Sequence, residues 1–168
     1  MFVAMTGGSP EFGSAKNELL AFVETVWDHD AFFALCCYRA KARLQQLGVP
    51  ILPRIAHRVA MATSQICIGD PVIVAPGIYV PHGQIVIDGI VTIATRVTVR
   101  PWVTIGLEEG NYFGPTIERG VQIGTGAKVF GEISVGAGSR IGANAVVVKN
   151  VEPQTTVVGV PARPVSKS

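Results

Sequence analysis

GVQIGTGAKVFGEISVGAGSRIGANAVVV, residues 120–148, carries a branched aliphatic residue at every sixth position. These residues are Ile123, Val129, Val135, Ile141 and Val147. Towards the N-terminus the series continues in the same phase through Ile87, Ile93, Val99, Ile105 and Ile117. A six-residue period is too short for helical repeats and is typical of parallel β-helices. Three hexads would form one triangular coil of about 18 residues, with one aliphatic side chain on each side pointing inward.

Small residues often follow the aliphatic position, as Gly124, Gly136 and Gly142 do, and they allow the backbone to turn sharply at the corners of a coil. An ordinary β-sandwich would instead show alternation with period 2 and irregular turn spacing. The pattern therefore predicts a mainly β domain, a parallel β-helix, over residues 66–151. The segment GLEEGNYFGPT lacks the inward aliphatic residues, so residues 106–116 are expected to leave the coil as a loop. Residues 152–168 would form a C-terminal tail.

Residues 14–65 have a different composition, rich in leucine and alanine, and predict a short α-helical N-terminal region. Asp30 can cap the apolar-periodic run that follows it, and Gly48 with Pro50 marks the end of that helix. Further helices are expected from Ser14 to about Trp27 and from about Pro53 to Thr63. The stretch GGSPEFGS, residues 7–14, is typical of a vector-derived linker, and residues 1–13 are excluded from fold reasoning.

The composition excludes several classes of protein. A net charge of +2 over 168 residues is too small to indicate nucleic acid or an anionic membrane as a partner. No apolar run approaches the roughly 20 residues of a membrane-spanning helix, and the start lacks the features of a secretory signal. Three cysteines, two of them adjacent, make a poor disulfide framework and fit a reducing cytoplasm.

The stretch GIYVPHGQIVIDG, residues 77–89, breaks the six-residue count by one position. The earlier phase is set by Ile68, Val74 and Val80. It disagrees by one residue with the phase that resumes at Ile87. An inserted residue distorts a coil locally and can re-aim a side chain, as bulges near active sites do. Pro81 stiffens the backbone, and His82 is the only histidine of the repeat region. His82 is therefore the candidate functional residue.

The repeats, together with the tail TTVVGVPARPV, resemble the hexapeptide-repeat acyltransferases, over nearly all of residues 40–165. Helices ahead of the coils and the segment GIYVPHG followed by IVI are most similar to the serine acetyltransferase branch. The resemblance implies a left-handed parallel β-helix, a known exception to right-handed parallel crossovers. It also implies a homotrimer that transfers acetyl from acetyl-CoA, with active sites between subunits and no metal.

An imidazole suits this chemistry because it gains and loses its proton near neutral pH. His82 would remove the proton of an acceptor hydroxyl during attack on the thioester, and the imidazolium would then protonate the departing thiolate. No acyl-enzyme is required, since the two substrates only need to be held together while one proton moves. The sequence thus predicts an O-acetyltransferase with direct transfer to a small acceptor.

Three positions depart from the serine acetyltransferase pattern. The acidic residue fifteen places before the histidine falls on Cys67, and the aspartate just before it falls on Pro81. The second histidine of the family falls near Gly114. Acetyl transfer is therefore a safer expectation than serine as the acceptor. The group that orients His82 stays open between a backbone carbonyl and four carboxylates, Asp70, Asp88, Glu108 and Glu109.

The resemblance also suggests binding residues. Those expected against CoA are Gly106, Thr125, Ala143, Lys149 and Arg163. Small residues let the pantetheine arm approach the backbone, and basic side chains suit the nucleotide phosphates. Candidate acceptor-binding residues are Tyr112, Phe113, Asp88 and Glu108. The two aromatic residues would either cover the acceptor pocket of a neighbouring subunit or pack at the seam of the trimer.

Two other functions compete with this one. The γ-class carbonic anhydrases use the same coil but need three histidines around zinc, and the repeat region supplies one. A non-catalytic trimeric scaffold would explain the missing acidic residues. Within the transferases, a sugar or a specialised metabolite remains an alternative acceptor to serine.

Overall fold

The computed structural model describes residues 30–165, and the predicted helix from Ser14 to Trp27 lies outside them. Two helices come first, α3 (Asp30–Gln46) and α4 (Leu52–Ser64). Helix α3 ends ahead of Gly48, whose φ of 69° is the left-handed conformation expected of a helix C-terminus. Pro53 lies in the first turn of α4, where its missing N–H costs no hydrogen bond.

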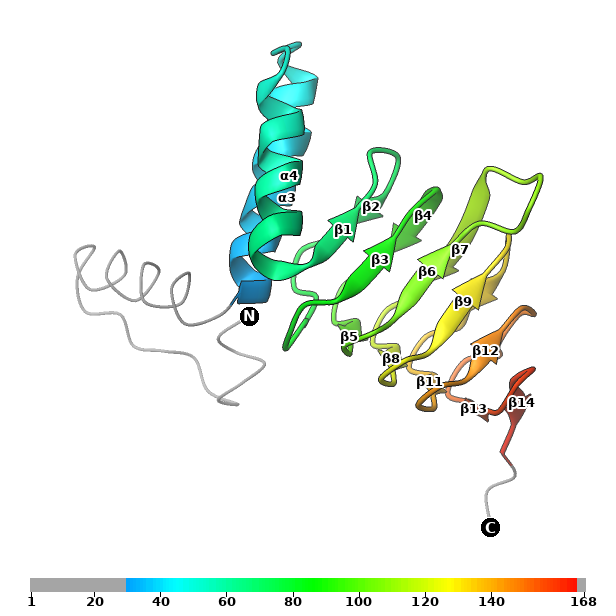
Figure 1. The fold of residues 1–168 in the computed structure, drawn as a ribbon. Coiled ribbons are helices and arrows are strands. Elements are labelled where there is room, and N and C mark those ends of the chain that lie inside the picture. The colour runs from blue at the N-terminus through cyan, green and yellow to red at the C-terminus, as the bar shows by residue number, and fades with distance from the viewer. Residues whose placement is uncertain (1–29, 166–168) are drawn as a thin grey trace.

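Short parallel strands form three sheets that run the length of the molecule (Figure 1). The first sheet contains β1 (Ile66–Ile68), β3 (Ile85–Ile87), β6 (Thr104–Gly106), β9 (Lys128–Phe130) and β12 (Val146–Val147). The second contains β2 (Ile73–Val74), β4 (Ile90–Ile93), β7 (Phe113–Ile117) and β10 (Ser134–Val135). The third contains β5 (Thr98–Val99), β8 (Gln122–Ile123), β11 (Arg140–Ile141), β13 (Thr156–Val158) and β14 (Arg163–Pro164).

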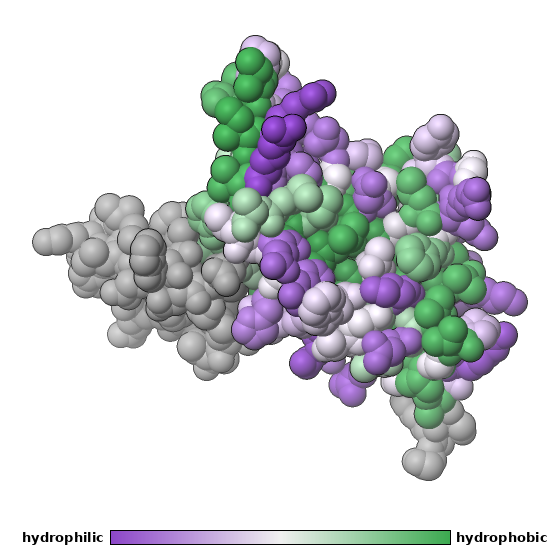
Figure 2. Space-filling model, in the orientation of Figure 1, coloured by the Kyte–Doolittle hydropathy of each residue, from purple (hydrophilic) through white to green (hydrophobic). Residues whose placement is uncertain are grey.

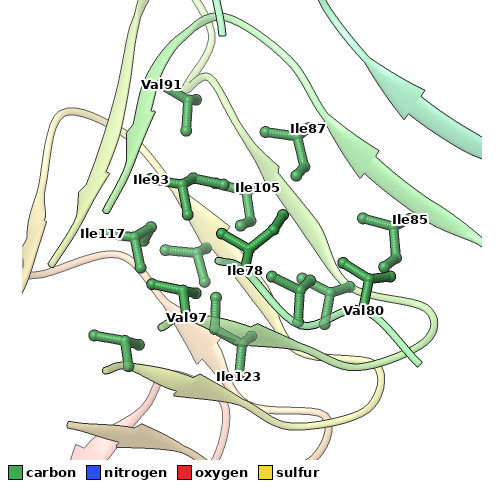
Figure 3. Packing of buried hydrophobic residues seen from close by; sticks show 14 of the residues in the cluster. Ile78, Val80, Ile85, Ile87, Val91, Ile93, Val97, Ile105, Ile117 and Ile123 are labelled. Carbon is green, nitrogen blue, oxygen red and sulfur yellow. The ribbon is translucent and has the colours of Figure 1, made fainter. Parts of the chain in front are cut away.

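The core fills the space that the three sheets enclose. Figure 3 shows side chains of the six-residue series, among them Ile87, Ile93 and Ile105, pointing into this interior. They are fully or almost fully buried, and each stacks on its equivalent in the next coil. Burying one such aliphatic side chain contributes about 1.5–3 kcal/mol. The sequence period therefore identified the core residues correctly.

Strand pairing gives the length of each coil. Ile87 pairs with Ile105, eighteen residues later, as three hexads require. Ile68 pairs with Ile87, nineteen residues later, so the first coil holds the extra residue that the sequence predicts. Ile105 pairs with Val129 over 24 residues, because the chain makes an excursion between β6 and β7. The irregular part is shorter than predicted and covers residues 107–112, since β7 already begins at Phe113.

The coil also continues beyond the predicted boundary at residue 151. Strand β13 pairs in parallel with β11, with Ile141 opposite Val157. The chain then folds back, and β14 pairs antiparallel with β13. Part of the expected tail therefore extends the third sheet.

Helix α3 covers the end of the coil that would otherwise expose unpaired strand edges. The Tyr38 hydroxyl donates to the carbonyl oxygen of Val72 at 2.7 Å and accepts from the N–H of Val74. Lys41 reaches the carbonyl oxygens after β1 from the same helix. A solenoid needs such a cap, because its terminal coil has no neighbour on one side.

The outer side of the helical hairpin is apolar, as the green area over α3 and α4 shows (Figure 2). Exposed apolar residues there are Leu47, Ile51, Leu52, Ile55 and Val59. Contacts within residues 30–165 therefore leave part of this surface uncovered.

Candidate functional site

The corner that carries His82 is wider than the corners below it. Between the third and first sheets the chain turns through the four residues 81–84. The next three coils use only three residues at the same corner, namely 100–102, 124–126 and 142–144. We call this column of corners the His82 edge. The register change falls within residues 81–84, because Tyr79 still pairs nineteen residues ahead, with Thr98, and Val86 already pairs eighteen ahead, with Thr104.

Gly83 fixes this wide corner against the end of α4. A Cβ atom at Gly83 would overlap the carbonyl oxygen of Ser64, so only glycine allows the approach. The N–H of Ile85 donates to the carbonyl oxygen of Gln65 at 3.1 Å and ties the corner to the start of β1. His82 is exposed here, and its ring has no hydrogen-bond partner within residues 30–165. The imidazole is therefore accessible to a ligand.

Two of the predicted CoA contacts lie on the same edge as His82. Thr125 and Ala143 occupy the middle position of the third and fourth corners, and both are exposed. Backbone hydrogen bonds stack the corners: Trp102 donates to Gln84, Gly126 to Pro101 and Asn144 to Thr125, each at 2.9 Å. The third and fourth corners of this edge thus present small exposed residues, beyond the corner of residues 100–102 that lies next to His82.

The other predicted residues lie across the first sheet, at the edge where the chain passes to the second sheet. We call this the loop edge, since residues 107–112 project from it. Gly106 and Lys149 from the CoA set lie here, with Asp88, Glu108, Tyr112 and Phe113 from the acceptor set. Tyr112 and Phe113 are exposed. Within one chain, therefore, the first sheet separates the loop residues from His82.

None of the four candidate carboxylates accepts a hydrogen bond from His82 in the described chain. Asp70 binds Lys41 at 3.0 Å, and Asp88 accepts from the N–H of Gly89 at 2.9 Å. Glu108 and Glu109 belong to the loop edge. The orienting group of His82 is therefore not supplied by these side chains within a single subunit.

Lys149 and Arg163 come together at the C-terminal end of the coil. Both line a hollow of about 450 Å³ between the chain after β12 and strand β14. The walls are apolar in part, with Val157 and Ala162 beside the two basic residues. Two cations at one hollow suit phosphate groups.

A larger groove of about 660 Å³ separates α4 from the first two coils. Helix α4 contributes Arg54, His57 and Arg58 to one wall, and the facing wall contains Asp70 and Asp88. Cys67 also lines it. The sequence analysis missed the three basic residues, because they occupy one face of a helix with no motif to mark them.

Cys67 occupies the position at which the related pattern has an acidic residue. Burial raises the pKa of the Cys67 thiol, and the negative charge of Asp88 raises it further. The thiol is therefore largely protonated at neutral pH and does not replace a carboxylate as a charged acceptor.

No group of three or more His, Cys, Asp or Glu residues in the part of the chain described is arranged to hold a metal ion. Neither described helix is long and apolar enough to cross a membrane.

Comparison with curated proteins finds serine acetyltransferases among the matches, although no protein-family model matches the sequence. A serine acetyltransferase of Synechococcus elongatus is 32% identical over 159 residues, which cover 92% of this chain and 63% of that protein. A serine acetyltransferase of Bacillus pumilus is 34% identical over 147 residues, 85% of this chain and 67% of that protein. The chain spans between about half and two thirds of the length of the curated relatives it matches.

Solved structures agree with this similarity. A soybean serine acetyltransferase complexed with serine superposes with a TM-score of 0.78 at 30% identity, over 84% of this chain and 59% of that one. A serine acetyltransferase in complex with CoA gives a TM-score of 0.74 at 30% identity, over 81% and 57%. The three-sided coil predicted by the hexads is thus the left-handed parallel β-helix that the family resemblance implies.

Proposed function

Since the chain belongs to the serine acetyltransferase family, a branch of the hexapeptide-repeat acyltransferases, we propose that it transfers acetyl from acetyl-CoA to a small hydroxyl acceptor. The observation that carries the proposal is the exposed His82 on the widened corner, at the head of the edge that also holds Thr125 and Ala143. A register change that re-aims one histidine, in a coil otherwise built of regular hexads, supports a functional role for that residue.

His82 acts as the general base. Its neutral imidazole accepts the proton of the acceptor hydroxyl while the hydroxyl oxygen attacks the thioester carbonyl. The tetrahedral intermediate then collapses, the C–S bond breaks, and the imidazolium returns the proton to the CoA thiolate. The products are the acetyl ester and CoA with a free thiol. Positioning the two substrates side by side supplies much of the rate enhancement.

The CoA molecule lies along the His82 edge, with its thioester near His82 and its pantetheine arm against Thr125 and Ala143. Both residues are small, and neither corner presents a bulky side chain that would hold the arm away from the backbone. The basic hollow at Lys149 and Arg163 lies at the C-terminal end of the coil, and Lys149 belongs to the loop edge, so the hollow of a neighbouring copy would bind the nucleotide phosphates.

A homotrimer completes the site. In one chain the loop edge and the His82 edge lie on opposite sides of the first sheet, so Tyr112 and Phe113 do not line the same site as His82. A neighbouring copy that places its loop edge beside the His82 edge would bring both sets of residues to one seam. The acceptor would then be enclosed by His82 of one subunit and the loop of the next. We expect this assembly in the cytoplasm.

Serine is the first acceptor to test, because the relatives carry that name and one of them is solved with serine bound. Sugars and other small hydroxyl compounds belong in the same panel, since Cys67, Pro81 and Gly114 differ from the pattern of the family. Serine carries its own carboxylate and amine, and these charged groups require partners in the site.

The test measures CoA thiol release with a thiol-reactive dye, over serine, sugars and aminoglycoside-like acceptors. Wild-type protein is expected to release thiol in an acceptor-dependent way, and His82→Ala to lower kcat by at least about a hundredfold while CoA still binds. Arg96→Ala, at the edge between β4 and β5, is the matched control and is expected to retain activity. Intact CoA binding without turnover on any acceptor would identify a scaffold and overturn the proposal.

A further inference from the structure

Trp102 has an unusual position on the His82 edge. It occupies the last position of its corner with φ at 66°, in the left-handed region, and its side chain is 57% exposed. The last positions of the other three corners are also left-handed, with φ of 65° at Gln84, 75° at Gly126 and 55° at Asn144. Trp102 is the bulkiest of these four residues, and a bulky residue is uncommon in this region. Nothing in the geometry of the corner itself requires an indole.

The backbone of Trp102 is held on both sides. Its N–H donates to the carbonyl oxygen of Gln84 at 2.9 Å, and its own carbonyl oxygen accepts from Lys128 Nζ at 2.7 Å. Lys128 Nζ also donates to Thr104 Oγ1 at 3.0 Å, which fixes the ammonium group. These hydrogen bonds hold the left-handed corner in place and so fix the point on the edge from which the indole projects.

The order of the corners places Trp102 between the two halves of the proposed site. Down the His82 edge the corners carry His82, Trp102, Thr125 and Ala143 in turn, one coil apart. A pantetheine arm that lies against Thr125 and ends with its thioester at His82 must cross the corner of Trp102. The acyl group and the last atoms of the arm therefore meet Trp102, the one exposed large apolar side chain of these four corners, with the exposed Arg100 at the start of the same corner.

We infer that Trp102 determines acyl-chain specificity: its indole forms the wall beside the thioester and limits the donor to short acyl-CoA molecules. This inference rests on the proposed function, because it uses the path of CoA along the His82 edge. Trp102 carries out no chemistry itself. It acts by its volume, since a chain longer than acetyl would have to displace the indole or leave the edge.

The experiment compares the affinities of wild-type protein and variants for acetyl-CoA and butyryl-CoA by calorimetry. Wild-type protein is expected to bind acetyl-CoA at least about tenfold more tightly than butyryl-CoA, the size of discrimination that a tight apolar wall provides. In Trp102→Ala the two affinities should come within about threefold of each other, and Trp102→Phe should retain most of the difference. The matched control is Arg96→Ala, because Arg96 is exposed with φ at 59° and lies at another edge, between β4 and β5.

A second readout uses the indole itself. The chain has two tryptophans, so Trp27→Phe leaves Trp102 as the sole reporter. Its fluorescence is expected to change on titration with acetyl-CoA. If the ratio of the acetyl-CoA affinity to the butyryl-CoA affinity is the same in wild type and in Trp102→Ala, the inference is overturned. It is also overturned if Trp102→Ala changes the oligomeric state and leaves this ratio unchanged. If no acceptor is ever acetylated but the ratio depends on Trp102, the proposed activity fails and this inference stands.

Discussion

Lys41 Nζ of helix α3 donates a 2.8 Å hydrogen bond to the carbonyl oxygen of Ile68, the last residue of the first strand of the coil. The same ammonium group donates to Gly69 and forms an ion pair with Asp70 at 3.0 Å. Its side chain is only 2% exposed. These three partners are consecutive residues at the end of β1, so this buried lysine, together with Tyr38, joins the helical cap to the solenoid.

Replacing Lys41 with alanine is expected to destabilise the protein by about 2–4 kcal/mol, because the carbonyl oxygens of Ile68 and Gly69 lose their charged donor and Asp70 loses its ion pair. Chemical denaturation followed by circular dichroism measures the loss. Arg43→Ala, an exposed position on the same helix, is the control and should change stability by less than about 0.5 kcal/mol. Equal stability of the two variants would show that Lys41 does not hold the cap.

The ion pair between Asp70 and Lys41 predicts that the stability of the protein depends on pH. The hydrogen bond from Lys41 holds the pKa of the Asp70 carboxyl below its ordinary value, with Lys41's positive charge acting in the same direction. Its contribution is therefore present above the unfolded pKa of about 3.9 and is lost as pH falls through the folded pKa. The contribution should be small, because the side chain is 72% exposed.

Asp70→Asn should therefore lower the free energy of unfolding by a constant amount above about pH 5, and the difference from wild type should shrink below about pH 4. Urea denaturation at a series of pH values measures it. A difference that stays constant through this acid range would contradict the assignment.

Gly83→Ala tests how the His82 corner is placed. The added methyl group would overlap the carbonyl oxygen of Ser64, so the corner must move away from the end of α4. We expect kcat to fall at least about tenfold, because a displacement on the order of 1 Å at a catalytic group is costly, with only a modest loss of thermal stability.

Gly77→Ala is the control for that variant, since nothing lies within 4 Å of a Cβ at Gly77 and this residue lies outside the His82 edge and the loop. Its left-handed φ of 78° gives it a backbone cost of its own, which a stability measurement reports separately. Unchanged kcat in Gly83→Ala would mean that the corner position does not control the reaction.

The burial of the core series predicts that two isoleucines of the coil contribute very differently to the stability of the protein. Ile105 is fully buried and Ile73 is 64% exposed. Ile105→Ala should cost about 2–5 kcal/mol, because it leaves a cavity in the stack of aliphatic side chains. Ile73→Ala should cost less than about 1 kcal/mol. Thermal unfolding of both variants compares them directly.

The three cysteines should react slowly with thiol reagents in the folded protein. All are free, and burial raises the pKa of Cys36, Cys37 and Cys67, so little thiolate is present at neutral pH. Labelling with a disulfide dye should be slow at pH 7, accelerate as pH rises, and become fast in denaturant. Rapid labelling of three thiols in native protein would contradict this prediction, and would also obscure the release of CoA in the dye assay.

The sequence alone determined the three-sided coil, its core residues and the position of the slip at His82. The reason is that each hexad places one aliphatic residue, such as Ile87 or Ile105, on the inner side of the coil. The core residues can therefore be identified from the local repeat without knowledge of long-range contacts. A single extra residue can also be recognised in the sequence, because it shifts the phase of every later hexad by one position.

Only the tertiary structure decided which side chains share an edge. Thr125 and Ala143 lie below His82, and Glu108 and Tyr112 lie across the first sheet, because coil length and the six residues of the loop set the stacking. For the same reason, no pattern in the sequence singles out Trp102. Its exposed position, its left-handed backbone and its place between His82 and Thr125 arise from contacts between neighbouring coils, which no local pattern in the sequence records.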